Sequence, residues 1–450
     1  MTPTDVLRDR IQKLFPQLLA DLDDLVRIPS VSAPAFDQEH VRASAERVAE
    51  LLRRSGMPDV QILSVPGGAP AVVARRPGPP GSPTVMLYAH HDVQPPGEAA
   101  DWTTPPFEPH ERDGRLYGRG AADDKAGVMT HIAALRALGD DLPVGVTVFV
   151  EGEEEIGSPT FGAFLGHFRE LLRADVIVVA DSDNWKTSIP ALTTTLRGLV
   201  DGTITVRTLD HAIHSGMYGG AVPDAMLAAI RLLSSLWDDA GRLAIPGLVN
   251  GTDPDADYPE PDLRADSGLL EGVSLIGNGS IASRLWTQPS LTIIGIDAPP
   301  VERASNTLLP SVRVKFSMRI APGQDPAAAF DAFASAVRAR VPFGAEAEIE
   351  PGEAGHAFAA DSSGEVYAKA RWALAEAWGT SPVDVGIGGS IPFVADLVSV
   401  YPDATVLITG IEDPDSRAHG ANESLHLGVF ARASLAEALF LMALSGTVDS

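Results

Sequence analysis

The first third of the chain alternates short apolar runs with segments whose apolar residues recur at helical spacing. Three runs rich in β-branched and other apolar residues are typical of buried strands: residues 84–89, 145–150 and 175–180. Three segments have the spacing of amphipathic helices: residues 40–56, 125–139 and 161–174. Buried strands that alternate with helices predict an α/β fold, in which a mostly parallel sheet carries helices on both faces.

The pattern changes near residue 191, where a second type of organisation begins. Residues 194–208 alternate apolar and polar positions, which is typical of a strand with one solvated face. Further helices and strands are predicted at 224–237, 290–296, 311–320, from Pro326 onward, and at 345–351. After residue 356 the α/β pattern returns. We therefore expect an inserted α+β domain at 191–355, between two parts of a larger α/β domain at 1–190 and 356–450.

Composition and charge narrow the possible ligands and partners. The chain has 450 residues, of which 45% are hydrophobic and none is cysteine. Without cysteine there are no disulfides and no thiolate ligands, so a metal would have to be bound by His, Asp and Glu. The net charge of −26 disfavours nucleic acid and anionic membranes as partners, because nothing would neutralise their phosphates.

Membrane-targeting signals are not evident in the sequence. The N-terminal residues lack the basic-then-apolar pattern of a signal peptide, and we expect no apolar run near the ~18 residues of a membrane span. A cytoplasmic protein is therefore the expectation.

Acidic and histidine residues follow the three apolar runs above and a fourth run at residues 404–409. They lie in LYAHHDVQPPG (87–97), EGEEEIGS (151–158), DSDN (181–184) and GIEDPDSRAHGANE (410–423). A fifth segment, YGRGAADDKAG (117–127), brings Asp123 and Asp124 to the start of a predicted helix. Each segment alone also fits a structural role, such as a solvated acidic face, a turn or a helix N-terminus. Because ligands collect at the carboxyl ends of strands in α/β sheets, the five together predict a dinuclear metal site.

These segments, with HSGMYGG (214–220) and GGSIP (388–392), occur in the order and spacing of the M20 metallopeptidases. The chain most resembles the carnosinase-like, cytosolic non-specific dipeptidase branch, over essentially its whole length. The resemblance implies a zinc-peptidase-like catalytic domain with a central, mostly parallel sheet. It also implies that the inserted α+β domain is ferredoxin-like and serves as a lid and dimerisation domain.

The resemblance assigns metal binding to five side chains. They are His90, Asp123, Glu155, Asp183 and His419. Asp123 would bridge two divalent ions; one would take His90 and Asp183, and the other Glu155 and His419. Zinc is the usual metal of the family, and manganese or cobalt suits the same ligands.

Neighbouring residues support or compete for these roles. Asp92 matches the aspartate that orients the first histidine ligand, which agrees with residues i and i+2 of a strand facing the same side. His91 would then face the opposite side, and we interpret it as a non-ligand. Asp181 remains the alternative to Asp183 in the DSDN segment.

Catalytic and substrate-binding roles follow from the same resemblance. Glu154 matches the general base. His214 matches a histidine that reaches into the partner subunit's site and steadies the oxyanion, and Arg319 matches an arginine that binds the substrate's C-terminal carboxylate. Further substrate contacts are expected from Asn306, Thr307, Gly389 and Ser390. Glu151 and Glu153 are interpreted as neighbours or supporting residues of the ligands, and His211 and His426 as residues without a role at the site.

The function implied is that of a metal-dependent dipeptidase. It would cleave dipeptides with a free C-terminal carboxylate through a hydroxide that bridges two metals, and it would act as a homodimer joined through the inserted domain. An alternative within the family is a deacylase of N-acetyl- or N-succinyl-amino acids. A non-catalytic binding protein on the same fold is a third hypothesis, which predicts a missing ligand or base; every one of these positions is filled.

Overall fold

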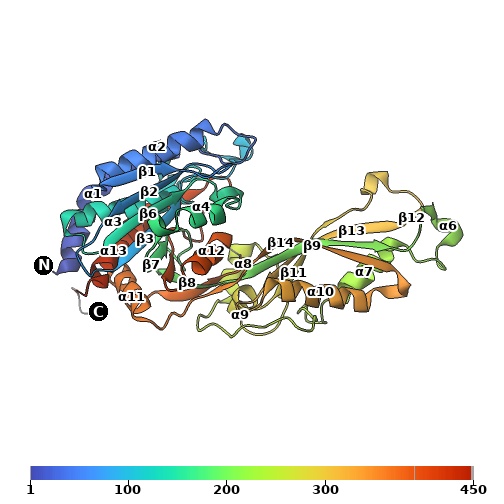
Figure 1. Ribbon diagram of the computed structural model, residues 1–450. Coiled ribbons are helices and arrows are strands. Elements are labelled where there is room, and N and C mark those ends of the chain that lie inside the picture. Colours follow the sequence, from blue (N-terminus) through green and yellow to red (C-terminus); the bar gives the residue numbers. More distant parts are fainter. Residues whose placement is uncertain (1, 390, 447–450) are drawn as a thin grey trace. The chain divides into compact units, whose positions relative to one another are not determined.

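The computed structural model describes residues 2–389 and 391–446, which divide into two compact units (Figure 1). Unit 1 contains Met1–Thr194, Ala360–Val385 and Pro392–Ser450, and unit 2 contains Thr195–Ala359 and Gly386–Ile391. Unit 2 begins at Thr195 instead of residue 191 because strand β8 (Ala191–Leu196) pairs with β17 (Thr405–Thr409) in the sheet of unit 1. The glycine-rich segment before α12 also belongs to unit 2, which its position in the sequence did not indicate.

Unit 1 is built around a sheet with a parallel centre. In the described residues the strand order is β1-β2-β6-β3-β7-β17-β8-β15, and β16 pairs with β8. The strands not yet given are β1 (Asp59–Leu63), β2 (Ala71–Arg76), β3 (Thr84–His90), β6 (Gly145–Glu151), β7 (Val176–Val179), β15 (Phe358–Ala359) and β16 (Val383–Ile387). The four central strands, β6, β3, β7 and β17, are parallel, and the flanking pairs are antiparallel.

Helices cover both faces of this sheet, as predicted, because alternate strand residues are apolar on both sides. Leu87 of β3 packs into the larger core, with residues of α1 (Pro3–Val26), α2 (Glu39–Arg54), α3 (Lys125–Leu138), α11 (Glu365–Trp378) and α13 (Leu427–Leu444). Its neighbour Tyr88 faces the other way and stacks on Phe393 of α12 (Pro392–Val400), with 4.3 Å between ring centroids. On the same side Phe149 of β6 stacks on Phe164 of α4 (Phe161–His167), which precedes the short α5 (Arg169–Leu172).

The closing helix α13 corrects one expectation. Among the described residues it is the one helix that is long and apolar enough to cross a membrane, with a mean hydropathy of 1.7. However, 67% of this helix is buried inside the protein, where it packs against α1, α3 and α11. The apolar composition is therefore that of a core helix with neighbours on most sides.

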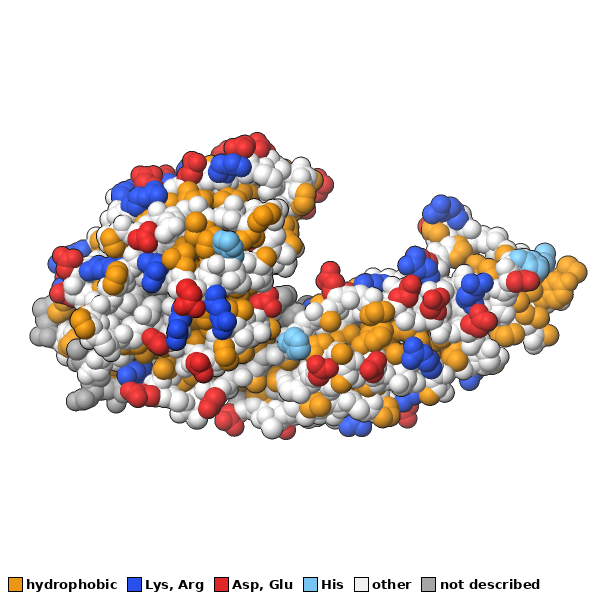
Figure 2. Space-filling model, viewed as in Figure 1, with side chains coloured by type: hydrophobic (Ala, Val, Ile, Leu, Met, Phe, Trp, Pro, Cys, Tyr) orange, Lys and Arg blue, Asp and Glu red, His pale blue; other side chains and the backbone are white. Residues whose placement is uncertain are grey.

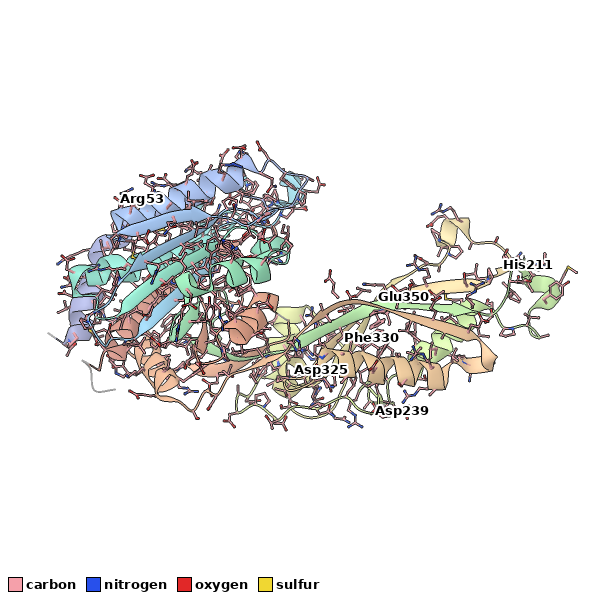
Figure 3. The ribbon with its side chains drawn as sticks, in the orientation of Figure 1. Arg53, His211, Asp239, Asp325, Phe330 and Glu350 are labelled. Carbon is pink, nitrogen blue, oxygen red and sulfur yellow. The ribbon has the colours of Figure 1, made fainter. Side chains whose placement is uncertain are left out.

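Unit 2 has the predicted ferredoxin-like topology. Its antiparallel sheet has the order β11-β13-β9-β14, and two helices connect its strands in a βαββαβ sequence. The elements are β9 (Gly198–Arg207), α7 (Ala225–Ser234), β11 (Ser290–Ile296), β13 (Ser311–Ile320), α10 (Pro326–Arg340) and β14 (Glu346–Gly355). Asp325 caps α10 by accepting a hydrogen bond from Ala328 N at 2.8 Å, and Phe330 follows in its first turns (Figure 3).

Smaller elements complete the two units. In unit 1, β4 (His110–Arg112), β5 (Arg115–Tyr117) and β18 (Ser424–His426) form a three-stranded sheet. In unit 2, β10 (Ile213–His214) pairs with β12 (Thr307–Leu308), and the short helices are α6 (Ser215–Tyr218), α8 (Glu260–Ser267) and α9 (Ile281–Trp286). The three-stranded sheet joins the Asp123 segment to the His419 segment, which matters for the site below.

Candidate metal centre

Two groups of side chains in unit 1 meet at the carboxyl ends of the parallel strands. The first contains His90, Asp123 and Asp181, and the second contains Asp123, Glu155 and His419. Within each group, the potential ligand atoms lie within 4.8 Å of one another. His90 ends β3, and Glu155 and Asp181 follow β6 and β7, so the sheet itself brings these segments together.

Asp123 is shared between the two groups through its two carboxylate oxygens. Its Oδ1 lies 3.0 Å from Nε2 of His90, and its Oδ2 lies 3.0 Å from Nε2 of His419. Nε2 of His419 is also 3.1 Å from Oε2 of Glu155, and Nε2 of His90 is 3.9 Å from Oδ1 of Asp181. One carboxylate that offers a separate oxygen to each of two imidazole–carboxylate pairs is the arrangement expected of a bridging ligand.

The electrostatics of the cluster favour bound cations. Burial, reinforced by the charge of Asp123, raises the pKa of Glu155 to about 7 and that of Asp181 to about 6. Hydrogen bonds to Asp123 and Glu155 raise the pKa of His419 to about 10. Burial would also raise the pKa of Asp123, but hydrogen bonds from His419 and His90 outweigh it and lower that pKa.

The donor set fits divalent metal ions. Three carboxylates and two imidazoles offer only oxygen and nitrogen, which zinc, manganese and cobalt accept. Carboxylates that raise one another's pKa in a buried cluster gain most from added positive charge. On this chemistry, His90, Asp123 and Asp181 would hold one ion, and Asp123, Glu155 and His419 the other.

Asp181, and not Asp183, lies with His90 and Asp123, which favours the alternative ligand of the DSDN segment. The backbone of Asp183 forms a bridge to Glu412, and the residue is exposed. Positions 181 and 183 share a side by strand alternation, so periodicity could not distinguish them. Both positions lie beyond Val179, where β7 ends, so only the folded chain separates them.

Asp92 supports both sides of the centre. Nδ1 of His90 lies 3.1 Å from the carbonyl of Asp92 and 3.4 Å from its Oδ1, which leaves Nε2 to face Asp123. The carboxylate of Asp92 also accepts hydrogen bonds from the backbone N–H groups of Glu154 and Glu155, at 3.2 and 3.0 Å. One residue therefore orients the histidine and fixes the turn that carries the two glutamates.

Gln94 and Asp124 are supporting residues to which the sequence gave no role. The backbone N–H of Gln94 donates to Oε1 of Glu155 at 2.9 Å, which leaves Oε2 for His419. Oδ2 of Asp124 accepts the backbone N–H of His90 at 3.1 Å, and its Oδ1 caps α3. Their places in the sequence could have indicated a supporting role, because each lies in a polar segment within four residues of a candidate ligand.

His91 lies on the opposite side of β3 from the cluster. Its Nε2 lies 2.9 Å from the carbonyl of Pro70, and burial lowers its pKa to about 4, so it stays neutral. It contributes to packing and to one buried hydrogen bond.

We expect His91→Ala to retain both metals while losing about 1–3 kcal/mol of unfolding free energy, because it removes a buried hydrogen bond and leaves a cavity. His90→Ala should lose bound metal, since it deletes a ligand of the first group. Elemental analysis and thermal unfolding of the two variants check this. Metal loss in His91→Ala alone would mean that the two histidines have been assigned the wrong way round.

Glu154 lies beside the cluster without belonging to either group. Its carboxylate is 4.0 Å from Nε2 of His90, its side chain is 20% exposed, and burial raises its pKa well above the usual value. In the same segment, residues 151–158, Glu155 belongs to a ligand group, and the two remaining glutamates have structural partners. Glu151 accepts the hydroxyl of Tyr88 at 2.6 Å, and Glu153 accepts backbone N–H groups from two other segments. Among the glutamates of residues 151–155, Glu154 is therefore the one that lies beside the cluster without belonging to it.

Unit 2 carries the remaining predicted residues. His214 ends β10, where Thr307 of β12 pairs with it, and the carbonyl of Asn306 accepts the backbone N–H of Ser215. Arg319 lies on β13, opposite Ser290 of β11. Gly389 lies in the segment that follows β16, and Ser390 lies outside the described residues. His211 pairs with Asp210 close to α6 (Figure 3), and in unit 1 His426 caps α13, so both have structural partners.

Comparisons with known proteins assign the chain to a family of peptidases. Residues 86–443 match the family described as peptidase family M20/M25/M40. The chain is 38% identical to a cysteinylglycine-S-conjugate dipeptidase of Corynebacterium striatum, over 80% of this chain and 81% of that protein. It is 31% identical to the beta-Ala-His dipeptidase of Rattus norvegicus, over 86% and 82% of the two chains.

A solved structure shares the fold over nearly its full length. The crystal structure of human carnosine dipeptidase 1 superposes with a TM-score of 0.79 at 25% identity, and the match covers 99% of each chain. These matches confirm the predicted fold class. The chain belongs to the peptidase family M20/M25/M40 and is a hydrolase that acts on peptide bonds.

Proposed function

We propose that the chain is a metal-dependent dipeptidase that cleaves dipeptides with a free C-terminal carboxylate. The observation that carries the proposal is Asp123, whose two oxygens face two separate imidazole–carboxylate pairs, with Glu154 beside them. Relatives named as dipeptidases, at 38% and 31% identity, support the same substrate class. The competing deacylase function would use the same centre on N-acyl amino acids.

Two divalent ions, zinc first and manganese or cobalt as alternatives, are the proposed cofactors. When bound, such a pair polarises a carbonyl oxygen and lowers the pKa of water toward neutrality. Glu154 would accept the proton of the attacking water and donate it to the leaving amine. Asp92 would keep Nδ1 of His90 engaged, so that Nε2 stays directed toward Asp123.

Residues of unit 2 are proposed to bind the rest of the substrate. Arg319 would hold the C-terminal carboxylate through its planar guanidinium fork, helped by Gly389 and Ser390. His214, with Asn306 and Thr307 beside it, would stabilise the oxyanion from a partner subunit. Supporting a homodimer, apolar side chains are exposed around the α6 end of unit 2, with Met217 73% and Tyr218 46% exposed (Figure 2).

We expect Arg319→Met to raise KM for a free dipeptide about 10- to 100-fold, because a charge-assisted contact worth about 1.5–3 kcal/mol is lost. The KM for the C-terminally amidated dipeptide should not change. Steady-state kinetics on both substrates measure the effect. Arg313→Met is the matched control, since Arg313 lies on the same strand and the same face six residues earlier. An equal rise in KM for the amidated substrate would show that Arg319 does not recognise the carboxylate.

A cytoplasmic location remains a prediction, which rests on the N-terminal residues lacking the pattern of a signal peptide.

A further inference from the structure

A buried ion pair joins two segments of the metal centre. Arg119 and Glu423 have side chains that are 1% and 0% exposed, and Nη1 of Arg119 donates to Oε2 of Glu423 at 2.7 Å. A buried pair of this kind costs desolvation energy, and an apolar pair of similar size would stabilise the fold as well or better. The other contacts of the two side chains therefore indicate what the pair does.

Glu423 holds the backbone that leads to Asp123. Its Oε1 accepts the N–H groups of Ala122 and Asp123, at 3.0 and 3.1 Å, and its Oε2 accepts the N–H of Gly120 at 3.1 Å. Three backbone donors from four consecutive residues converge on one carboxylate. The turn that presents the shared Asp123 is thus shaped around the side chain of Glu423.

Arg119 holds the backbone that carries His419. Its Nη2 donates to the carbonyls of His419 and Gly420, both at 3.1 Å, and more weakly to that of Pro95 at 3.5 Å. His419 has φ of +62°, a left-handed conformation that non-glycine residues rarely adopt, so it needs such support. The guanidinium also lies over the ring of Trp102, 5.5 Å from its centroid.

We propose that Arg119 and Glu423 are positioning residues that set Asp123 against His419, so that the two metal ions bind as a pair. Glu423 fixes the segment of the shared carboxylate, Arg119 fixes the segment of the exposed imidazole, and the ion pair locks one to the other. The result is the 3.0 Å contact between Oδ2 of Asp123 and Nε2 of His419. This inference rests on the proposed dinuclear centre.

A second buried pair in the same region provides a matched control. Arg115 of β5 donates to both carboxylate oxygens of Asp413 at 3.0 Å, with side chains 11% and 0% exposed. It joins β5 to the segment before β18, and the Arg119–Glu423 pair lies two residues beyond β5. In the described residues, its further hydrogen bonds go to Ser416 and Ser424, not to a metal ligand.

The test compares Glu423→Gln with Asp413→Asn by competition with a metal chelator and by the absorption spectrum of the cobalt-loaded proteins. We expect Glu423→Gln to weaken metal binding about 10- to 100-fold, with both ions lost together because they share Asp123, and to shift the cobalt spectrum. Asp413→Asn should lower the unfolding midpoint and leave affinity and spectrum unchanged.

Arg119→Lys keeps the charge but cannot serve both Glu423 and the two carbonyls. We expect this variant to weaken most the binding of the ion that His419 would hold, which would appear as a second step in the chelator titration. If Glu423→Gln does not fold, Arg119→Lys alone tests the proposal. Wild-type affinity and spectrum in these variants would overturn the proposal, as would equal losses of affinity in Asp413→Asn. If the wild type itself binds no metal, the proposed function fails instead.

Discussion

Replacing Glu154 with Gln should abolish most turnover while leaving the metal centre and the fold intact. Glutamine keeps the size of the side chain but cannot accept and return a proton, so kcat should fall about 10²- to 10⁴-fold. The carboxylate belongs to neither ligand group, which is why both ions should remain. Steady-state kinetics, elemental analysis and thermal unfolding of the same preparation measure the three quantities.

Glu155→Gln is the comparison variant, which distinguishes the loss of a base from the loss of a metal ligand. Glu155 lies one residue further and contacts His419 at 3.1 Å, so its neutral variant should lose activity together with one metal. Loss of activity in both variants, with loss of metal only in Glu155→Gln, separates the base from the ligand. A Glu154→Gln enzyme with nearly normal kcat would show that another group moves the proton.

Replacing Asp181 with Asn should remove one metal ion and lower activity by more than the roughly 10- to 100-fold typical of a residue behind the ligands. Oδ1 of Asp181 lies 3.9 Å from Nε2 of His90, and both belong to the first ligand group. A neutral amide is a poorer ligand than a carboxylate for a divalent ion. Metal content of the purified variant and its kcat/KM measure the change.

Asp183→Asn is the matched control, since it makes the same chemical change two residues away. Asp183 is exposed and its backbone pairs with Glu412, so this variant should keep both ions and most of its activity. If Asp183→Asn loses metal and Asp181→Asn does not, the ligand in this segment is Asp183 after all.

The fold could be predicted from the sequence because its strands show two distinct patterns: continuous apolar runs, and alternation of apolar and polar residues. Runs such as 145–150 are apolar throughout, and β6 is indeed buried on both faces. The alternation in 194–208 becomes β9, whose residues alternate between buried and half-buried. The limits of unit 2 were harder, because β8 looks like the start of the insertion yet pairs with β17.

Strand register by itself predicts one of the candidate ligands, His90, whereas Asp123, Glu155 and His419 follow from the resemblance to the M20 family. His90 is the last residue of β3, so alternation places it on the opposite side from His91. Asp181 and Asp183 lie beyond the end of β7, where the chain no longer follows the strand and periodicity gives no answer. Arg119 and Glu423 are 304 positions apart, so only the folded chain shows that they meet.

The most direct test of a metal-dependent dipeptidase is hydrolysis by the chelator-stripped protein before and after zinc, manganese or cobalt is restored. The substrates are a panel of free dipeptides beside N-acetyl- and N-succinyl-amino acids. The account predicts no activity in the stripped protein, recovery as about two ions bind per chain, and cleavage of the dipeptides in preference to the acyl compounds. Dipeptide hydrolysis that survives complete removal of metal, or activity on the acyl compounds alone, would contradict it.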